Sequence, residues 1–533
     1  MMKRKLLSIL ALLCLTVSGA WAQTYTNTVN INEASGEVVV NSGHWLITGT
    51  GEPTTNTIVI SGGWVTLSNV NISSSDKPCI ECTRYDAYIF LADETKNTLT
   101  ATGEKKAAIY VDQYLSLTIM GSTGELNATS GKYAAGIEGG YQSEINIKGG
   151  NIVAQGGQRG AGIGSGNGSQ AGGYINISGG NITAEGGQYG AGIGAGQNYC
   201  YDINISGGNI TAQGGKWAAG IGCGQGGTCN DITISGGIIT ANGSANAACI
   251  GCGRFAKCDY IYINDGVAKV TATKYNSNAS FIGSTAGYSC DWTIDGNSTN
   301  YVPEEGSDES TFPHYTSNVS GNTWTLTHKP YNVTANLVDG VYWSTFYSKA
   351  GNYQAPVGTQ VFAVNLDGTA IEMTEIGDRI VKSGEGVVLK QATESSDATT
   401  TIIMTLTEDA AAGDFSANSL TGTMTSITNP GNAYVLNKTT ENGVGFYKLS
   451  SEGTIGANKA YLTSTAGARE YFLFDEATGI APIDNGQWIM DNEAGAVYDL
   501  QGRRVSQPAK GLYIVRSAEG RLQGKNGKKY IKK

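Results

Sequence analysis

The chain has little of what catalytic, membrane-spanning and nucleic-acid-binding proteins usually rely on. Of its 533 residues, only 15% are charged, 9 are prolines and 3 are histidines. None of His44, His314 and His328 has a partner residue at a catalytic spacing, and no Gly-x-Ser-x-Gly, P-loop or His-Glu-x-x-His motif occurs. After residue 22, no segment is apolar over the ~20 residues that a membrane-spanning helix needs. The net charge of −10 argues against nucleic-acid binding, which requires basic patches.

Glycine is the residue in excess, with 76 copies. It does not recur at every third position, which excludes a collagen-like triple helix. A hydrophobic content of 40% and 28 tyrosines argue against disorder. Glycine together with β-branched residues predicts many short strands joined by tight turns.

Internal repetition determines the predicted fold. The unit INISGGNITAEGGQYGAGIGAG begins at Ile175 and recurs from Ile203, and weaker copies begin at Ile145 and Ile232. Degenerate copies begin near Ile58, Ile89, Leu117 and Ile261, so that the spacing is 26 to 32 residues throughout. Such a period is typical of architectures in which each repeat stacks on the next.

Each unit holds three apolar pieces, Ile-x-Ile, Ile-Thr-Ala and Ala-Gly-Ile-Gly, separated by glycine-rich corners. Apolar residues alternate within each piece, which is typical of strands. A unit of this size cannot bury its apolar face alone, so the units must stack. We therefore predict an all-β fold that begins with a right-handed parallel β-helix of about 29 residues per coil. A propeller has blades of ~40–45 residues and does not fit the period.

The N-terminus has the pattern of a secretory signal. Lys3, Arg4 and Lys5 precede an apolar run, and Ala20-Trp21-Ala22 provides a small-residue cleavage site. We expect cleavage near Ala22-Gln23 and a secreted or outer-cell-surface protein.

The C-terminus carries a second signal of export. Residues 496–505 read AVYDLQGRRV, residues 510–515 read KGLYIV, and the chain ends in NGKKYIKK. This order resembles the type A sorting domain of type IX secretion cargo in Gram-negative bacteria. The resemblance implies a small β-sandwich that interacts with the type IX secretion machinery and is often removed when the cargo is attached to the cell surface.

Part of the repeat resembles a known binding family over residues 58–145. Residues 89–100 read IFLADETKNTLT, and AIYV and LSLTI follow from Ala108 and Leu115. This is similar to secreted carbohydrate-binding β-helix proteins of the cellulose- and pectin-binding type. The resemblance implies binding of plant cell-wall polysaccharide, sometimes with calcium. The loop reads Ala-Asp-Glu-Thr where the family has Asp-Gly-Thr, so we assign no metal ligand and expect no cofactor.

A second β-rich region follows the repeat. Its alternating strands predict an antiparallel accessory β-sandwich. The predicted segments are the signal peptide (1–22), the carbohydrate-binding β-helix (23–300), a linker (301–330), the accessory β-sandwich (331–483) and the C-terminal sorting domain (484–533).

Stacked coils place equivalent residues in rows on the surface. The first row takes the residue four before the Ile of Ala-Gly-Ile-Gly in four consecutive coils: Tyr133, Arg159, Tyr189 and Trp217. We predict that its rings stack on sugars and that its arginine pairs with a uronate carboxylate. A second, looser row lies before the Ile-x-Ile pieces: Tyr141, Tyr199 and Phe255. The alternative is that both rows only stabilise the corners.

The cysteines also recur with the period of the coils. Two sets are one coil apart in sequence: Cys200, Cys229 and Cys258, and Cys223 and Cys252. A spacing of ~4.8 Å between coils is within the range that a disulfide allows, although parallel side chains would need a local shift. Free structural thiols and inter-coil disulfides therefore both remain open.

The carboxylates are too sparse for a glycosidase or lyase site, which needs them clustered. The strongest row, Glu144, Asp202 and Asp231, is interrupted by Tyr174 and Tyr260. We predict a non-catalytic cell-surface protein whose partner is a polysaccharide or another glycan. The alternatives are an adhesin that binds host or neighbour-cell protein, and a polysaccharide lyase or glycoside hydrolase on the β-helix.

Overall fold

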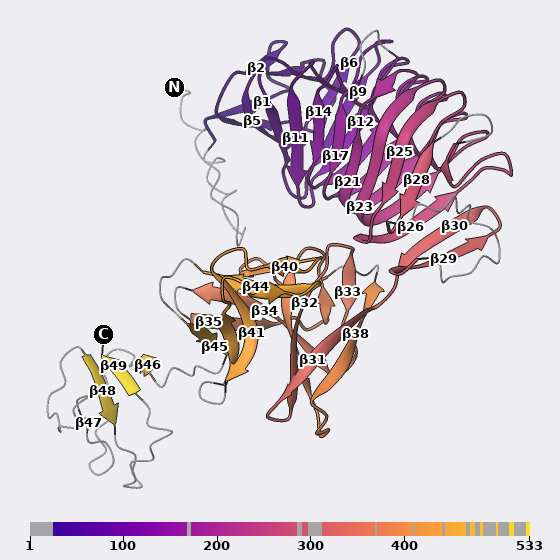
Figure 1. The fold of residues 1–533 in the computed structure, drawn as a ribbon. Coiled ribbons are helices and arrows are strands. Elements are labelled where there is room, and N and C mark those ends of the chain that lie inside the picture. Colours follow the sequence, from indigo (N-terminus) through magenta and orange to yellow (C-terminus); the bar gives the residue numbers. More distant parts are fainter. Residues whose placement is uncertain are drawn as a thin grey trace, which may run out of the picture.

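The computed structural model describes the fold of most of the chain (Figure 1). The described residues are 25–167, 172–284, 290–296, 312–367, 370–407, 409, 411–439, 443–464, 470–474, 480–482, 497–498, 511–515 and 529–532. All regular elements among them are strands. The predicted signal peptide and most of the sorting motif at residues 496–505 lie outside the described residues.

The N-terminal half is a solenoid of stacked parallel strands, as the repeat predicts (Figure 1). One of its faces is a ten-stranded sheet, sheet B, which takes one short strand from each coil. Its strands are β2 (Val38–Val40), β4 (Ile58–Ile60), β7 (Ile80–Cys82), β10 (Ile109–Val111), β13 (Ile137–Gly139), β16 (Ile163–Gly164), β19 (Ile193–Gly194), β22 (Ile221–Gly222), β24 (Ile250–Gly251) and β27 (Ile282–Gly283).

The other faces form one larger sheet, sheet A, in which the Ile-x-Ile and Ile-Thr-Ala pieces make adjacent rows of strands. Its strands are β1 (Asn27–Asn30), β3 (His44–Thr48), β5 (Gly63–Ser68), β6 (Asn71–Ser74), β8 (Ala87–Leu91), β9 (Lys96–Ala101), β11 (Ser116–Gly121), β12 (Glu125–Thr129), β14 (Glu144–Ile147), β15 (Asn151–Gln155), β17 (Tyr174–Ile177), β18 (Asn181–Glu185), β20 (Tyr199–Cys200), β21 (Ile203–Gln213), β23 (Thr228–Asn242), β25 (Lys257–Ile263), β26 (Val267–Thr273), β28 (Asp291–Ile294), β29 (Tyr315–Ser320) and β30 (Thr323–His328). The handedness expected from the sequence stays a prediction.

The core is a set of aliphatic ladders that run through the solenoid. Ile175 pairs in register with Ile145 on one side and Ile203 on the other, and all three are fully buried. Outward positions between these isoleucines also stack. Asn176 donates from Nδ2 to Asn146 Oδ1 at 2.9 Å, and Asn204 donates to Asn176 Oδ1 at 3.1 Å. In-register pairing therefore fixes both faces of each strand.

The C-terminal end of the solenoid is covered by a hairpin that the sequence analysis placed in a linker. Strands β29 and β30 pair with each other, and β30 pairs antiparallel with β26. Tyr315, Trp324 and Leu326 of this hairpin are fully buried in the solenoid core. An exposed parallel edge would leave backbone groups unpaired. Strand β30 pairs with those of β26, the last strand in the row formed by the Ile-Thr-Ala pieces.

Residues after 330 form two packed antiparallel sheets, in agreement with the predicted accessory sandwich. An eight-stranded sheet contains β31 (Tyr331–Val338), β32 (Val341–Tyr347), β33 (Asn352–Gln354), β34 (Thr359–Asp367), β35 (Ala370–Glu375), β36 (Ile380–Val381), β37 (Gly386–Ala392) and β38 (Thr399–Thr407). A five-stranded sheet contains β39 (Leu420–Thr423), β41 (Ala433–Thr439), β42 (Gly443–Lys448), β44 (Lys459–Thr463) and β45 (Tyr471–Leu473). A small pair is formed by β40 (Ile427–Thr428) and β43 (Thr454–Ile455).

The sandwich packs directly against the last coils, since Ala268 of β26 belongs to its core cluster. Four short strands follow in a separate sheet: β46 (Ile480–Pro482), β47 (Val497–Tyr498), β48 (Gly511–Val515) and β49 (Lys529–Lys532). A membrane-crossing helix, long and apolar enough for the task, does not occur in the described part of the chain.

The second glycine of Ala-Gly-Ile-Gly is required by the close approach of the coils. Gly222 has a φ of +127°, and a Cβ added there would lie 2.1 Å from the carbonyl oxygen of Gly251 in the next coil. Gly226 also has a positive φ, +69°, but its Cβ would meet nothing within 4 Å. An alanine at Gly222 would therefore clash with the next coil and strain the backbone, whereas an alanine at Gly226 would only strain the backbone.

We predict that Gly222→Ala destabilises the solenoid more than Gly226→Ala. Gly226→Ala incurs the cost of a left-handed backbone, ~1–2 kcal/mol. Gly222→Ala incurs backbone strain of ~1–3 kcal/mol at its larger positive φ and adds a clash worth ~1–3 kcal/mol. Urea denaturation followed by circular dichroism measures the difference. Equal losses of stability in the two variants would show that the coils accommodate the added methyl group.

Candidate functional site

The first predicted row lies on the turns that lead into sheet B, one residue per coil. The structure brings its members together. The Arg159 guanidinium carbon lies 5.4 Å from the ring centre of Tyr133 and 5.9 Å from that of Tyr189. Tyr189 and Trp217 are stacked, with ring centres 5.2 Å apart and planes at 23°. We call these four residues the cation–π ladder.

The ring faces of the ladder residues contact other members of the ladder. Each member is half-buried, and Tyr189 has the guanidinium of Arg159 on one side and Trp217 on the other. The buried Nε of Arg159 has no hydrogen-bond partner, so the rings are its main contacts. Cation–π contacts of this kind are worth ~0.5–1 kcal/mol when exposed and more when desolvated. A sugar could reach the edges of the inner rings but not their faces.

The three residues of the second predicted row do not lie together: Phe255 lies near the cation–π ladder, and Tyr141 and Tyr199 lie elsewhere. Phe255 is 54% exposed and packs against Arg254, whose guanidinium carbon lies 4.5 Å from its ring centre. Arg254 also approaches Trp217 at 5.9 Å, so Phe255 extends the cation–π ladder. Tyr141 and Tyr199 instead meet through Tyr201, at centre distances of 6.1 Å and 5.0 Å.

Tyr201 is the centre of a group of tyrosines near the N-terminal ends of the Ile-x-Ile strands of sheet A. It stacks on Tyr174 at 4.9 Å and 22°, while Tyr114 meets Tyr141 edge-on at 5.5 Å and 89°. We call Tyr114, Tyr141, Tyr174, Tyr199 and Tyr201 the tyrosine band. Three of its four ring contacts are edge-to-face, and Tyr114 is 63% exposed. In each edge-to-face pair, the ring that points its edge at the other keeps its own faces out of the contact, while one face of the other ring is covered.

The hydroxyl groups of Tyr199 and Tyr201 are protonated at neutral pH. Burial, followed by a hydrogen bond with Tyr141, raises the pKa of Tyr201 to about 12. Burial, followed by the charge of Asp259, also raises the pKa of Tyr199, whose hydroxyl donates to Asn230 Oδ1. These phenols can therefore act as both donors and acceptors toward a ligand.

Carboxylates accompany the band. Glu144 faces Tyr174 in the strand register, and Asp202 follows Tyr201 directly. Burial, then the charges of Asp202 and Asp259, raise the pKa of Asp231 above its ordinary value. The acidic row noted in the sequence thus lies beside the tyrosines.

Sequence reasoning missed three members of the band, Tyr114, Tyr174 and Tyr201. The available signal was their position one to three residues before an Ile-x-Ile piece or its degenerate equivalent. A separate aromatic patch on the outer face of β5 and β8 was also missed. There, Trp64 is 42% exposed and stacks on Tyr88 at 4.6 Å and on Phe90 at 5.4 Å.

The loop that carries the carbohydrate-binding resemblance has a structural contact of its own. Asp93 Oδ1 accepts hydrogen bonds from the Thr123 backbone N–H at 2.9 Å and from the Thr123 hydroxyl at 3.2 Å. Asp93 thereby joins its own turn to the equivalent turn of the next coil.

The family of the solenoid follows from its repeats. Residues 145–167, 175–197, 203–225 and 232–254 match a family model described as a beta helix repeat. These four segments of the solenoid are β-helix repeats. A comparison with curated proteins and with solved structures gives no match.

Three of the four matched β-helix repeats contain a member of the cation–π ladder. In the fourth, the equivalent position, four before the inward Ile250, is Asn246. The series of equivalent positions therefore ends at Trp217, and Arg254 and Phe255 continue the contacts from a different position in the next coil. Because a fold supports many functions, the β-helix repeat by itself defines no ligand.

The cysteine ladders predicted from the period are confirmed. Cys200, Cys229 and Cys258 pair in register. Burial and then the thiols of Cys229, Cys252 and Cys258 raise the pKa of Cys223, and the thiols of Cys223, Cys258 and Cys290 lower the pKa of Cys252. Six thiols thus form one cluster near the end of the β-helix: Cys200, Cys223, Cys229, Cys252, Cys258 and Cys290. All nine described cysteines are free thiols in the structure.

We predict that the eight buried thiols are inaccessible to reagents in the folded protein. Burial raises the pKa of Cys79 and of Cys249 to about 12, so neither is a thiolate at neutral pH. Alkylation under native conditions should reach only the half-exposed Cys290, and slowly, because Cys252, Cys258 and burial raise the pKa of Cys290. After denaturation without reductant, mass spectrometry should show all nine labelled. Labels missing in pairs, and restored by a reductant, would instead establish inter-coil disulfides.

Proposed function

We propose that this chain is an exported, non-catalytic surface protein whose β-helix binds an extended polysaccharide along the tyrosine band. The observation that carries the proposal is the arrangement of the band. Its rings come from successive coils, near the N-terminal ends of the Ile-x-Ile strands of sheet A, and most of them meet edge-to-face, so that the ring that points its edge at a neighbour keeps its own faces out of that contact.

The chemistry of the band suits a carbohydrate. An aromatic ring offers an apolar face to the C–H groups of a sugar, and its phenol hydroxyl offers hydrogen bonds. The neighbouring Asp202 and Asp231 are acceptors for sugar hydroxyls. Neutral phenols beside carboxylates therefore provide stacking, donation and acceptance within one strip of surface.

The repeat supplies many such contacts in series. Consecutive coils are ~4.8 Å apart, so a polymer lying along the solenoid axis meets a new coil at each step. Weak contacts joined by one ligand chain give a much higher overall affinity than any of them alone. A polymer is thus the favoured ligand over a free monosaccharide.

The cation–π ladder is a second contact surface for the same ligand class. Its ring edges and Arg159 remain half-exposed, and a guanidinium pairs well with a uronate carboxylate. The ladder residues have already used most of their ring faces on one another. We therefore assign the ladder mainly a stabilising role and the tyrosine band the main binding role.

Export and surface attachment complete the proposal. They rest on the signal-like N-terminus and on the resemblance of residues 484–533 to a type A sorting domain. In this proposal the solenoid binds glycan, the sandwich acts as a spacer, and the type IX secretion machinery is the partner during export.

We predict that Tyr201→Ala and Tyr114→Ala weaken polysaccharide binding at least tenfold, about 1.4 kcal/mol. Affinity electrophoresis of residues 23–533 through gels that contain plant or microbial polysaccharides measures the change. Tyr189→Ala tests the ladder. Tyr275→Ala is the matched control, because Tyr275 is 71% exposed and belongs to neither row.

The outcomes separate the alternatives. Retardation that is lost in the band variants and kept in Tyr275→Ala supports the band. Loss in Tyr189→Ala with the band variants unaffected would move the site to the ladder. No retardation in any gel would refute glycan binding and favour a protein-binding adhesin, whereas release of reducing ends during incubation would establish an enzyme.

A further inference from the structure

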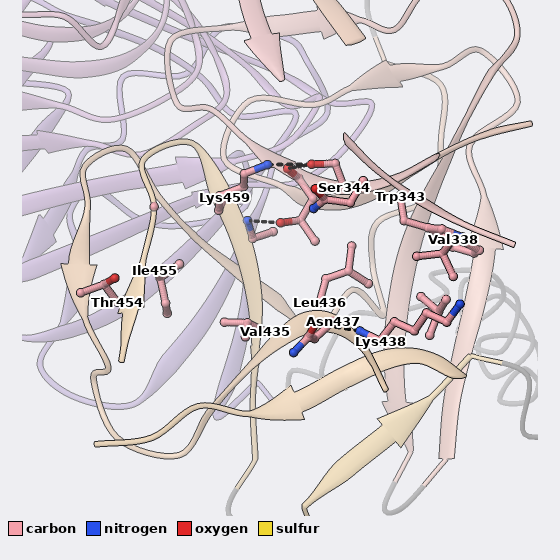
Figure 2. Close-up of a pocket in the computed structure, with 15 residues that line it drawn as sticks. Val338, Trp343, Ser344, Val435, Leu436, Asn437, Lys438, Thr454, Ile455 and Lys459 are labelled. Atoms are coloured by element: carbon pink, nitrogen blue, oxygen red, sulfur yellow. Dashed lines mark hydrogen bonds between the residues drawn. The ribbon is translucent and has the colours of Figure 1, made fainter. Parts of the chain in front are cut away.

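A pocket lies between the two sheets of the accessory sandwich, far along the chain from the tyrosine band. Its volume is about 320 Å³, which is at the lower end of the ~300–1,000 Å³ typical of small-molecule sites. Figure 2 shows Lys459 and Ser344 on one side of the pocket and Leu436, Asn437 and Lys438 on the other. The first pair comes from β44 and β32, and the other three from β41.

The pocket contains a lysine without a counter-ion. Lys459 Nζ donates to Ser344 Oγ at 2.6 Å and to the Thr334 carbonyl oxygen at 3.4 Å. Burial lowers the pKa of Lys459, with no contribution from a nearby carboxylate. Among the described residues, no carboxylate forms an ion pair with it. Lys459 is half-buried, and a charged group that is partly removed from water is stabilised by a partner.

A second lysine of the same pocket provides the contrast. Lys438 Nζ lies 3.0 Å from Asp339 Oδ1 and is therefore neutralised. Apart from these two lysines, the described lining holds no other charged side chain. The positive charge of Lys459 is thus the one that a ligand would compensate.

The remaining lining defines the rest of the ligand. Val435, Leu436 and Ile455 supply apolar walls, and Ser344 supplies a hydroxyl that already donates to the Thr334 carbonyl at 2.8 Å. An ammonium has three donors, and the described contacts of Lys459 use two of them. The site therefore offers one charge-assisted donor beside an apolar cavity.

We propose that this pocket binds a small carboxylate with a compact apolar body, whose carboxylate pairs with Lys459. The proposal does not depend on polysaccharide binding by the β-helix. It assigns the accessory sandwich a ligand of its own in addition to its role as a spacer.

Isothermal titration calorimetry of the full chain with sodium benzoate tests the proposal. Benzoate should bind at one site, and benzamide, which has the same shape without the charge, should bind at least tenfold more weakly. Lys459→Met should lose benzoate binding at least tenfold. Lys438→Met, the matched control, should retain it because Asp339 already neutralises that lysine.

The pH dependence gives a second readout. The ligand requires protonated Lys459, whose pKa lies below its ordinary value. Benzoate affinity should therefore be constant at neutral pH and fall as the pH rises through the pKa of Lys459. A benzoate complex with unchanged affinity over that range would contradict the assignment.

A third variant covers the case in which Lys459→Met fails to fold. Leu436→Trp fills the pocket from the opposite wall while leaving Lys459 in place, and it should abolish binding. Absence of benzoate binding to the wild-type chain, or equal binding by wild type and either pocket variant, would overturn the proposal. Benzamide bound as tightly as benzoate would also overturn it.

Discussion

The stacking of inward isoleucines is the interaction on which the rest of this structure depends. Burial of one such side chain is worth ~1.5–3 kcal/mol, but a coil obtains it only when another coil covers it. The backbone hydrogen bonds of the sheets likewise join different coils. A slip of one residue would turn every isoleucine outward. Register is therefore fixed at every coil, and all outward side chains inherit that register.

Rows of identical residues follow directly from this constraint. The asparagines at the outward position of β14, β17 and β21 bond to one another in sequence, and the cysteines stack in the core. The cation–π ladder forms in the same way, because its residues occupy equivalent positions and so stack face to face. The tyrosines of the band occupy non-equivalent positions, in a strand for Tyr174 and in loops for Tyr141 and Tyr201, and most of their rings meet at steep angles.

The repeat made most of the β-helix predictable, since period, inward residues and ladder positions all recur in the sequence. The sequence did not predict the features that lie outside the repeated pattern. The capping hairpin from Tyr315 to His328 has no copy elsewhere, although its alternation of buried residues is that of a strand. The position of Tyr201 depends on loop length, which differs between coils. The Lys459–Ser344 contact joins residues 115 apart, and no local pattern could indicate it.

Two cations without a carboxylate partner show how side-chain chemistry separates structural groups from binding groups. The guanidinium of Arg159 is planar and weakly hydrated, so aromatic faces are adequate neighbours for it. Tyr133 and Tyr189 provide those faces, so that the charge is stabilised even when no ligand is bound. The ammonium of Lys459 is compact and strongly hydrated, and apolar walls cannot replace its water. Because it opens onto a cavity and not onto a ring, an anion is the partner that would lower its energy most.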